Sequence, residues 1–114
     1  MAGTAAISST FVISVRPTDA VATVITNPGR AFRIIGVGAN NTDAAVAHDV
    51  DVLNGILVVV PAAETAAATT YSMMELTQAS CDVPIGAALT VTVANVAVDQ
   101  VDIICVTTGG GQAL

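Results

Sequence analysis

At 114 residues the chain is long enough for one domain of ordinary size and too short for two separate cores. Its 54% hydrophobic content excludes an intrinsically disordered protein, because that much apolar surface can offset the entropy lost on folding. Nine acidic residues face three arginines and no lysine, giving a net charge of -6. This charge excludes nucleic acid as a partner, because phosphate backbones are bound by clustered basic side chains.

The ends of the chain and its longest apolar run define one folded region. Residues 1–9 are small and polar and residues 109–114 are rich in glycine, so we expect flexible arms on either side of a domain over residues 10–108. The start of the chain lacks the basic and apolar regions of a secretory signal. The apolar run at residues 55–63 is too short for a membrane helix. We therefore expect a protein made as a soluble cytoplasmic product, with no membrane partner.

Two β-strands are predicted near the start of the domain. Residues 10–16 and 20–26 are rich in Val, Ile and Thr, which favour extended backbone. Pro17 ends the first segment because it cannot donate a backbone hydrogen bond, and the Asn-Pro-Gly sequence at residues 27–29 predicts a turn after the second.

A third strand is predicted over residues 30–38. Alternation divides its side chains between two faces, with Phe32 and Ile34 on one and Arg33, Ile35 and Val37 on the other. Gly36 and Gly38 interrupt the strand and indicate a β-bulge or a close backbone approach. Residues 39–43 then have the Asn, Thr and Asp content that is typical of a turn.

The strongest local signal is a β-hairpin. Residues 49–53 alternate strictly between polar and apolar side chains, and residues 56–60 are continuously apolar. Between them lies the Asn54-Gly55 sequence, which supplies the two positive-φ residues of a type I′ turn. We therefore predict a tight turn centred on these two residues.

The second half of the domain repeats the pattern of short strands. Residues 61–70 are ambiguous between helical turns and a loop, and we expect a loop because the stretch is too short for a stable isolated helix. Further strands are predicted at residues 70–76, 88–94 and 101–107, with a turn at 81–86. Seven to nine short strands joined by turns predict an all-β single domain, either an antiparallel β-sandwich or a jelly-roll-like barrel.

A search for chemistry begins with the single histidine, His48. It is flanked by Asp49 and Asp51, and a catalytic relay or a metal site needs further partners at a recognisable spacing. Asp49 and Asp51, with Asn54, are oxygen donors that calcium accepts, yet the glycine and terminal glutamate of a calcium loop are missing. We expect a surface or interface histidine and no metal or cofactor.

The remaining acidic residues do not indicate an enzyme. Asp99 and Asp102 are three residues apart, so strand periodicity predicts that they lie on different faces. The sequence leaves open a pair of carboxylates for glycoside hydrolysis, because residues that are distant along the chain can meet in space. The candidates are Glu64, Glu75 and Asp82. A glycosidase also needs a sizeable cleft and aromatic platforms, and the chain has three aromatic residues in all.

The two cysteines, Cys81 and Cys105, have no metal-binding or redox spacing. Both are flanked by β-forming residues, and we expect two buried reduced thiols, because free cysteine commonly behaves as a small hydrophobic residue. The alternative of one disulfide bond between them is undecided by the sequence.

The charge and apolar content indicate contacts with other proteins. A small domain this hydrophobic leaves apolar surface outside unless another subunit covers it, so we expect a homo-oligomer or a piece of a larger assembly. Arg16, Arg30 and Arg33 are the candidate interface residues, since a guanidinium pairs well with carboxylates. Ordinary surface ion pairs are the alternative for all three.

Several features together resemble the small virion proteins of tailed bacteriophages, and among them the capsid decoration, or cement, proteins. These features are a short chain without lysine, β-segments rich in Ala, Val and Thr, a polar N-terminal arm and a glycine-rich tail. The resemblance implies a β-rich structural protein, without enzymatic activity, that binds the exterior of an assembled capsid and braces the major capsid protein. It favours a trimer, with a dimer as the second choice.

A carbohydrate- or receptor-binding β-sandwich of a fibre or spike is the alternative. Such a module uses an exposed aromatic platform or a bound ion, and Tyr71 is the one aromatic side chain with a polar group. The two hypotheses differ in the partner, a capsid surface in one case and a glycan in the other.

Overall fold

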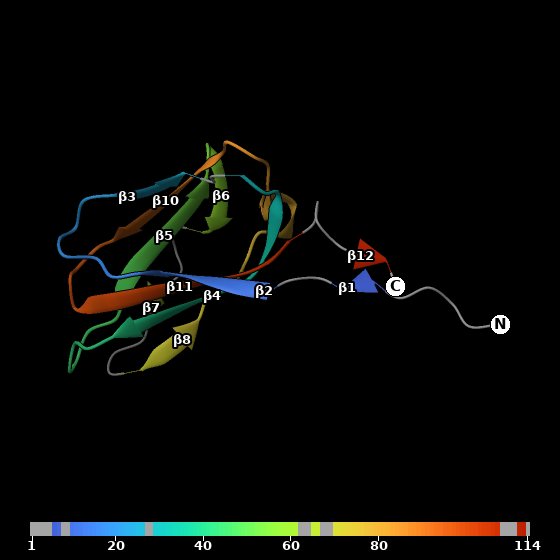
Figure 1. Cartoon of the computed structure of the whole chain (residues 1–114). Coiled ribbons are helices and arrows are strands. Elements are labelled where there is room, and N and C mark those ends of the chain that lie inside the picture. The colour runs from blue at the N-terminus through green and yellow to red at the C-terminus, as the bar shows by residue number, and fades with distance from the viewer. Residues whose placement is uncertain are drawn as a thin grey trace.

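Strands with alternating apolar side chains stack into two antiparallel β-sheets that pack face to face (Figure 1). The computed structural model describes residues 6–7, 10–26, 29–61, 65–66, 70–107 and 112–113. The first sheet contains β2 (Thr10–Val15), β4 (Phe32–Asn41), β8 (Tyr71–Met73), β9 (Asp82–Val83) and β11 (Val98–Thr107). The second contains β3 (Thr23–Thr26), β5 (His48–Asn54), β6 (Leu57–Val60), β7 (Thr65–Ala66) and β10 (Ala88–Val93).

The strands pair as in one long hairpin that has been rolled up. β2 pairs with β11, β3 with β10, β4 with β8 and β5 with β6. Early strands thus pair with late strands, in order from the outside of the sequence inward. This is the pairing of a jelly roll, which consists of two packed sheets. The two predicted architectures, a β-sandwich and a jelly-roll-like barrel, therefore describe the same molecule. Eight of the described strands have three or more residues, within the predicted range.

Helix is almost absent from the part of the chain that the structure describes. The exception is η1, a single 3-10 turn (Gln78–Ser80) that leads into β9. No helix among these residues is long and apolar enough to cross a membrane.

Small apolar side chains fill the space between the sheets. On β10, Leu89, Val91 and Val93 are buried as predicted, while the threonines between them face outward. Val101 and Ile103 of β11 approach them from the other sheet and are fully buried. Interdigitation of such thin side chains lets two sheets close around a core whose one fully enclosed aromatic residue is Phe32, at 4% exposure.

The strand predicted over residues 30–38 exists, but one face was assigned wrongly. Ile34 pairs with Cys105 and Gly36 with Ile104, which leaves Ile35 as an extra residue in β4. This β-bulge confirms the prediction at Gly36, and it also returns Val37 to the core, where that side chain is fully buried. Strict alternation places Val37 on the face opposite Phe32 and Ile34, whereas all three side chains are buried on the same side.

The same strand is longer than predicted, because β4 continues through Asn41 into the expected turn. Asn41 is buried, its Nδ2 donates to the carbonyl oxygen of Val46, and its Oδ1 accepts from the backbone of Asp43. One side chain thus satisfies two backbone groups of the following loop, which frees the backbone of Asn41 to stay in the sheet.

The predicted hairpin is present as β5 and β6, with its turn shifted by one residue. Asn54 pairs with Leu57, so the two turn residues are Gly55 and Ile56. Gly55 has φ of 60°, which suits the first position of a type II′ turn, where glycine is favoured. Asn54 is instead the last, buried residue of β5.

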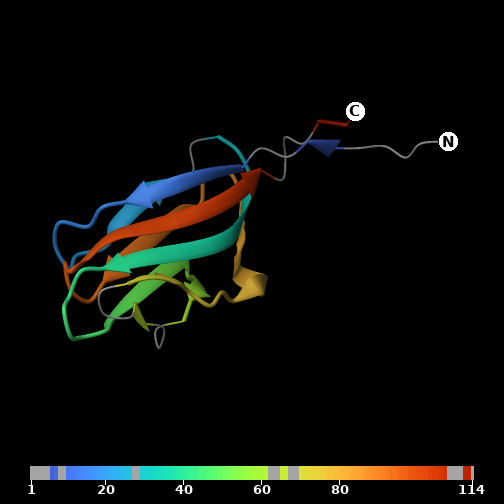
Figure 2. The ribbon, with the colours of Figure 1, turned by 90° about the horizontal axis from the view of Figure 1, so that it is seen from below.

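The first and last described strands pair with each other away from the sandwich. β1 (Ala6–Ile7) pairs with β12 (Gln112–Ala113), and Figures 1 and 2 show this short ribbon projecting from one end of the body. Most of the predicted arms at 1–9 and 109–114 lie outside the described residues. So does most of the ambiguous segment 61–70, apart from β7, which is extended and pairs with β5.

Candidate interaction surface

The outer face of the first sheet carries an unusual second layer above two glycines. A Cβ atom on Gly38 would lie 2.2 Å from the Tyr71 hydroxyl oxygen, and one on Gly36 would lie 3.2 Å from the Met73 Cε atom. Both overlying side chains come from the edge strand β8 and cross β4 toward β11. The two glycines thus provide the close approach that the sequence indicated, here by side chains instead of by backbone.

Asp102 is the polar centre of this face. Its carboxylate accepts hydrogen bonds from the hydroxyl groups of Ser14 and Tyr71 and from Gln100 Nε2, the last two at 2.8 and 2.9 Å. Partial burial opposes ionisation, but these bonds and the nearby Arg16 charge outweigh it and lower the Asp102 pKa. The pKa of Tyr71 moves the other way, to about 12, through burial and its bond to that carboxylate.

An apolar band lies beside this polar cluster, and we define it as Val12, Ile35, Met73 and Ile104. Val12 of β2 pairs with Ile104 of β11, which pairs in turn with Gly36 beneath Met73. Val12, Ile35 and Met73 are each more than half exposed. The band therefore crosses all four principal strands of the sheet and presents a nearly continuous apolar strip to the outside.

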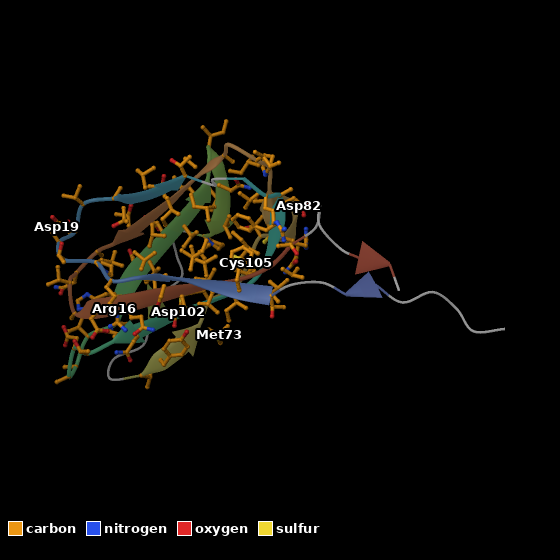
Figure 3. All side chains as sticks on the ribbon, in the orientation of Figure 1. Arg16, Asp19, Met73, Asp82, Asp102 and Cys105 are labelled. Atoms are coloured by element: carbon orange, nitrogen blue, oxygen red, sulfur yellow. The ribbon has the colours of Figure 1, made fainter. Side chains whose placement is uncertain are left out.

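The three candidate arginines lie at different places. Arg33 is held within its own chain, since it donates to Asp82 at 2.9 Å and to the side chain of Gln78 at 3.0 Å. Arg16 is exposed beside Asp102, as Figure 3 shows, and Arg30 lines a groove on another side of the molecule. No single surface brings the three together, so their shared role as interface residues stays a prediction.

The expectation that Asp99 and Asp102 face different sides is wrong. A register shift in β11 makes Asp99 an extra residue next to Gln100. Val98 and Val101 are both buried, and the residue that follows each of them, Asp99 and Asp102 respectively, is turned out of the core. The Asp99 carboxylate accepts a hydrogen bond from Asn40 Nδ2 at 2.9 Å.

His48 has a partner that its sequence neighbours did not reveal. Its Nε2 lies 2.8 Å from Asp43 Oδ2, and Asp43 also accepts from the backbone of Ala45 and Val46. The bond from Ala45, then the contact with His48 and the bond from Val46, lower the Asp43 pKa. The pair anchors the loop between β4 and β5. Among the described residues, no three His, Cys, Asp or Glu side chains gather as metal ligands would.

The carboxylates considered for hydrolysis do not converge where they are described. Asp82 is committed to Arg33, Glu75 is exposed, and Glu64 lies outside the described residues. Cys81 and Cys105 are buried free thiols, as expected, and the disulfide alternative is not realised. Burial raises the pKa of both thiols, that of Cys105 to about 12.

A groove of about 690 Å³ opens between the edges of the two sheets, at β2 and β3. Its walls include both phenylalanines of the chain, Phe11 and Phe32, whose rings meet edge to face with centroids 5.2 Å apart. Three threonines and Arg30 contribute the polar part of its rim. The two phenylalanines are far apart along the chain, so they form one wall only after the strands that carry them are brought together.

Comparison with protein-family models, with curated proteins and with solved structures found no match to this chain. Its function must therefore be argued from its own surfaces.

Proposed function

We propose that this chain is a capsid decoration protein, a structural protein that binds the exterior of an assembled phage capsid and braces its major capsid protein. The observation that carries the proposal is the apolar band on an otherwise hydrogen-bonded sheet face. An apolar centre with a polar margin is the usual anatomy of a protein interface. The acidic composition suits a protein partner and disfavours nucleic acid.

The band is built to bind without rearrangement. Tyr71 is fixed by its bond to Asp102, and β8 is fixed to β4 by backbone pairing, so little conformational entropy is lost when a partner covers them. Met73 is the adaptable element, because an unbranched thioether side chain fits irregular surfaces. A repeated lattice adds avidity, so that weak individual contacts produce firm attachment.

Jelly rolls serve in capsid proteins and in lectins alike, so the fold agrees with both hypotheses and selects neither. A glycan-binding module is favoured only by the groove with its threonine hydroxyl groups and Arg30. Against it, the Tyr71 side chain packs over Gly38 and its hydroxyl is engaged by Asp102, so its polar group is already used within the chain. We therefore place the capsid surface first.

Co-sedimentation with capsids assembled without this chain tests the proposal. The wild-type chain should pellet with the capsids, and Val12→Asp and Met73→Asp should each weaken binding by about tenfold or more, because a carboxylate is then desolvated in the contact. Val24→Asp is the matched control, since Val24 is 63% exposed on the second sheet. Failure of the wild type to bind, or equal loss with the control, would contradict the proposal.

A glycan array distinguishes the alternative. The decoration hypothesis expects no glycan to be retained, whereas strong retention that is lost in Arg30→Ala would favour the receptor-binding module. Genes for a major capsid protein and a portal beside this gene would support the decoration hypothesis independently.

A further inference from the structure

The sandwich is sealed along one long edge and open along the other. On the sealed edge, Val59, Val60 and Val83 are at most 1% exposed. On the open edge, Phe11 and Ile13 of β2 and Ile25 of β3 face inward but are only half-buried, because the groove lies above them. β2 and β3 are the last strands of their sheets on this side.

β2 also lacks the usual protection of an edge strand. Its six residues, Thr-Phe-Val-Ile-Ser-Val, include no charge and no proline, and its pairing with β11 contains no bulge. Natural edge strands are commonly blunted by such devices, or are very short, because an open edge pairs with other chains. The opposite edges end in β6 and β8, which have four and three residues. β2 is therefore the edge that is suited to pairing.

Charge indicates which chain pairs with it. Arg30 is the one charged side chain among the described residues that line the groove, and it lies at the end where β2 begins, near Thr10 and Thr107. Asp19 lies at the other end of β2, in the connection from β2 to β3. In Figure 3 it is at the opposite end of the sandwich from Asp82. Asp19 is exposed, and its Oδ1 accepts from the backbone of Val21, which holds the carboxylate in place.

We propose that a second copy of this chain docks on the open edge, with the two β2 strands antiparallel about a twofold axis. Antiparallel pairing places the Arg30 end of each copy against the Asp19 end of the other, so two opposite-charge contacts form by symmetry. The half-buried residues Phe11 and Ile13 of both copies then face the same shared interior, because paired residues of antiparallel strands point to the same side. Arg16 stays outside this contact, beside Asp102 on the outer face.

The proposal is independent of the capsid as a partner. The apolar band lies on the outer face of the first sheet, and the groove lies between the sheets, so both surfaces are available at once. Joining two β2 edges would also extend the outer face, so that a dimer presents two copies of the band side by side.

Charge reversal combined with sedimentation equilibrium tests the dimer. The wild-type chain should sediment at twice the 11.3 kDa of one copy. Arg30→Asp and Asp19→Arg should each weaken dimerisation by about tenfold, since each creates two like-charge contacts, and the double variant should recover to within about threefold of the wild type. Asp19→Asn keeps the turn acceptor and removes the charge, so it should weaken the dimer less than Asp19→Arg does.

Three outcomes would overturn the dimer. They are a wild-type monomer at the concentrations used for capsid binding, a trimer or larger ring, and a double variant that is no tighter than the single variants. Circular dichroism of each variant establishes that the sheet content is retained. Met73→Asp should remain dimeric while losing capsid binding, so failure of the dimer and failure of the decoration proposal give different results.

Discussion

Tyr71 occupies the space that a side chain at residue 38 would need. A Cβ atom on Gly38 would lie 2.2 Å from the Tyr71 hydroxyl oxygen and 2.5 Å from the ring carbon that bears it. The hydroxyl then reaches across β4 to Asp102 on the next strand, at 2.8 Å. A glycine on one strand therefore allows an aromatic side chain from the sheet edge to tie three strands together.

Gly38→Ala should destabilise the protein by displacing this ring. A clash with a packed ring costs about 1–3 kcal/mol, which urea denaturation followed by circular dichroism would measure. Gly29→Ala is the control, because a Cβ there meets no atom within 4 Å, and its effect should stay within about 0.5 kcal/mol. In a Tyr71→Ala background, Gly38→Ala should lose most of its effect. An undiminished effect there would show that Tyr71 is not the obstacle.

The titration of Tyr71 should be visible in isolation, because it is the only tyrosine. Its phenolate absorbance should have a midpoint near the pKa of about 12, above the ordinary 10.0. Asp102→Asn should move the midpoint downward, since the bond to the carboxylate and its charge are lost while burial remains. A wild-type midpoint at the ordinary value would refute the hydrogen bond between Tyr71 and Asp102.

The same shift fixes the sign of a pH dependence of stability. The native state holds the Tyr71 proton more tightly than the unfolded chain does, so this contribution is complete below about pH 10 and declines as the pH rises toward 12. Urea midpoints measured across this range should fall less steeply in Tyr71→Phe than in the wild type. Equal slopes would count against this prediction.

Asn54→Ala should destabilise the protein at the end of the sandwich near the hairpin. Asn54 is buried, and its Nδ2 donates to the carbonyl oxygens of Ser80 and Asp82, at 3.0 and 2.7 Å. These bonds join β5 of the second sheet to η1 and to β9 of the first sheet. Leaving the buried Ser80 carbonyl and the partly buried Asp82 carbonyl without this donor costs about 1–3 kcal/mol. Asn40→Ala, which removes one exposed amide bond to Asp99, should cost clearly less.

Both thiols should be protected from alkylation until the protein unfolds. Cys81 and Cys105 are fully buried, and burial raises both pKa values, so little reactive thiolate forms at neutral pH. Iodoacetamide labelling followed by mass spectrometry should show slow modification in buffer and rapid addition at both cysteines in urea. A mass lower by two hydrogens, with no labelling in urea, would reveal a disulfide bond instead.

Local periodicity was sufficient to determine the all-β class and much of the core. The alternation of Leu89, Val91 and Val93 with threonines assigns their faces correctly, because side chains of a strand alternate whatever its neighbours are. The same rule failed at Val37 and at Asp99, where a single extra residue shifts the phase. A bulge depends on pairing with a strand more than fifty residues away in these cases, which the local sequence does not report.

The sequence by itself determined a small acidic β-domain with apolar side chains to spare, because composition and alternation depend on neighbouring residues alone. Only the tertiary structure decided the rolled strand order, the partners of Asp102 and His48, and the open edge at β2. Each of these depends on segments that are distant in sequence and meet only when the sheets close. For the same reason the sequence identified the three arginines as charged residues but did not give their positions on the surface. The apolar band could not be recognised before its strands were brought side by side.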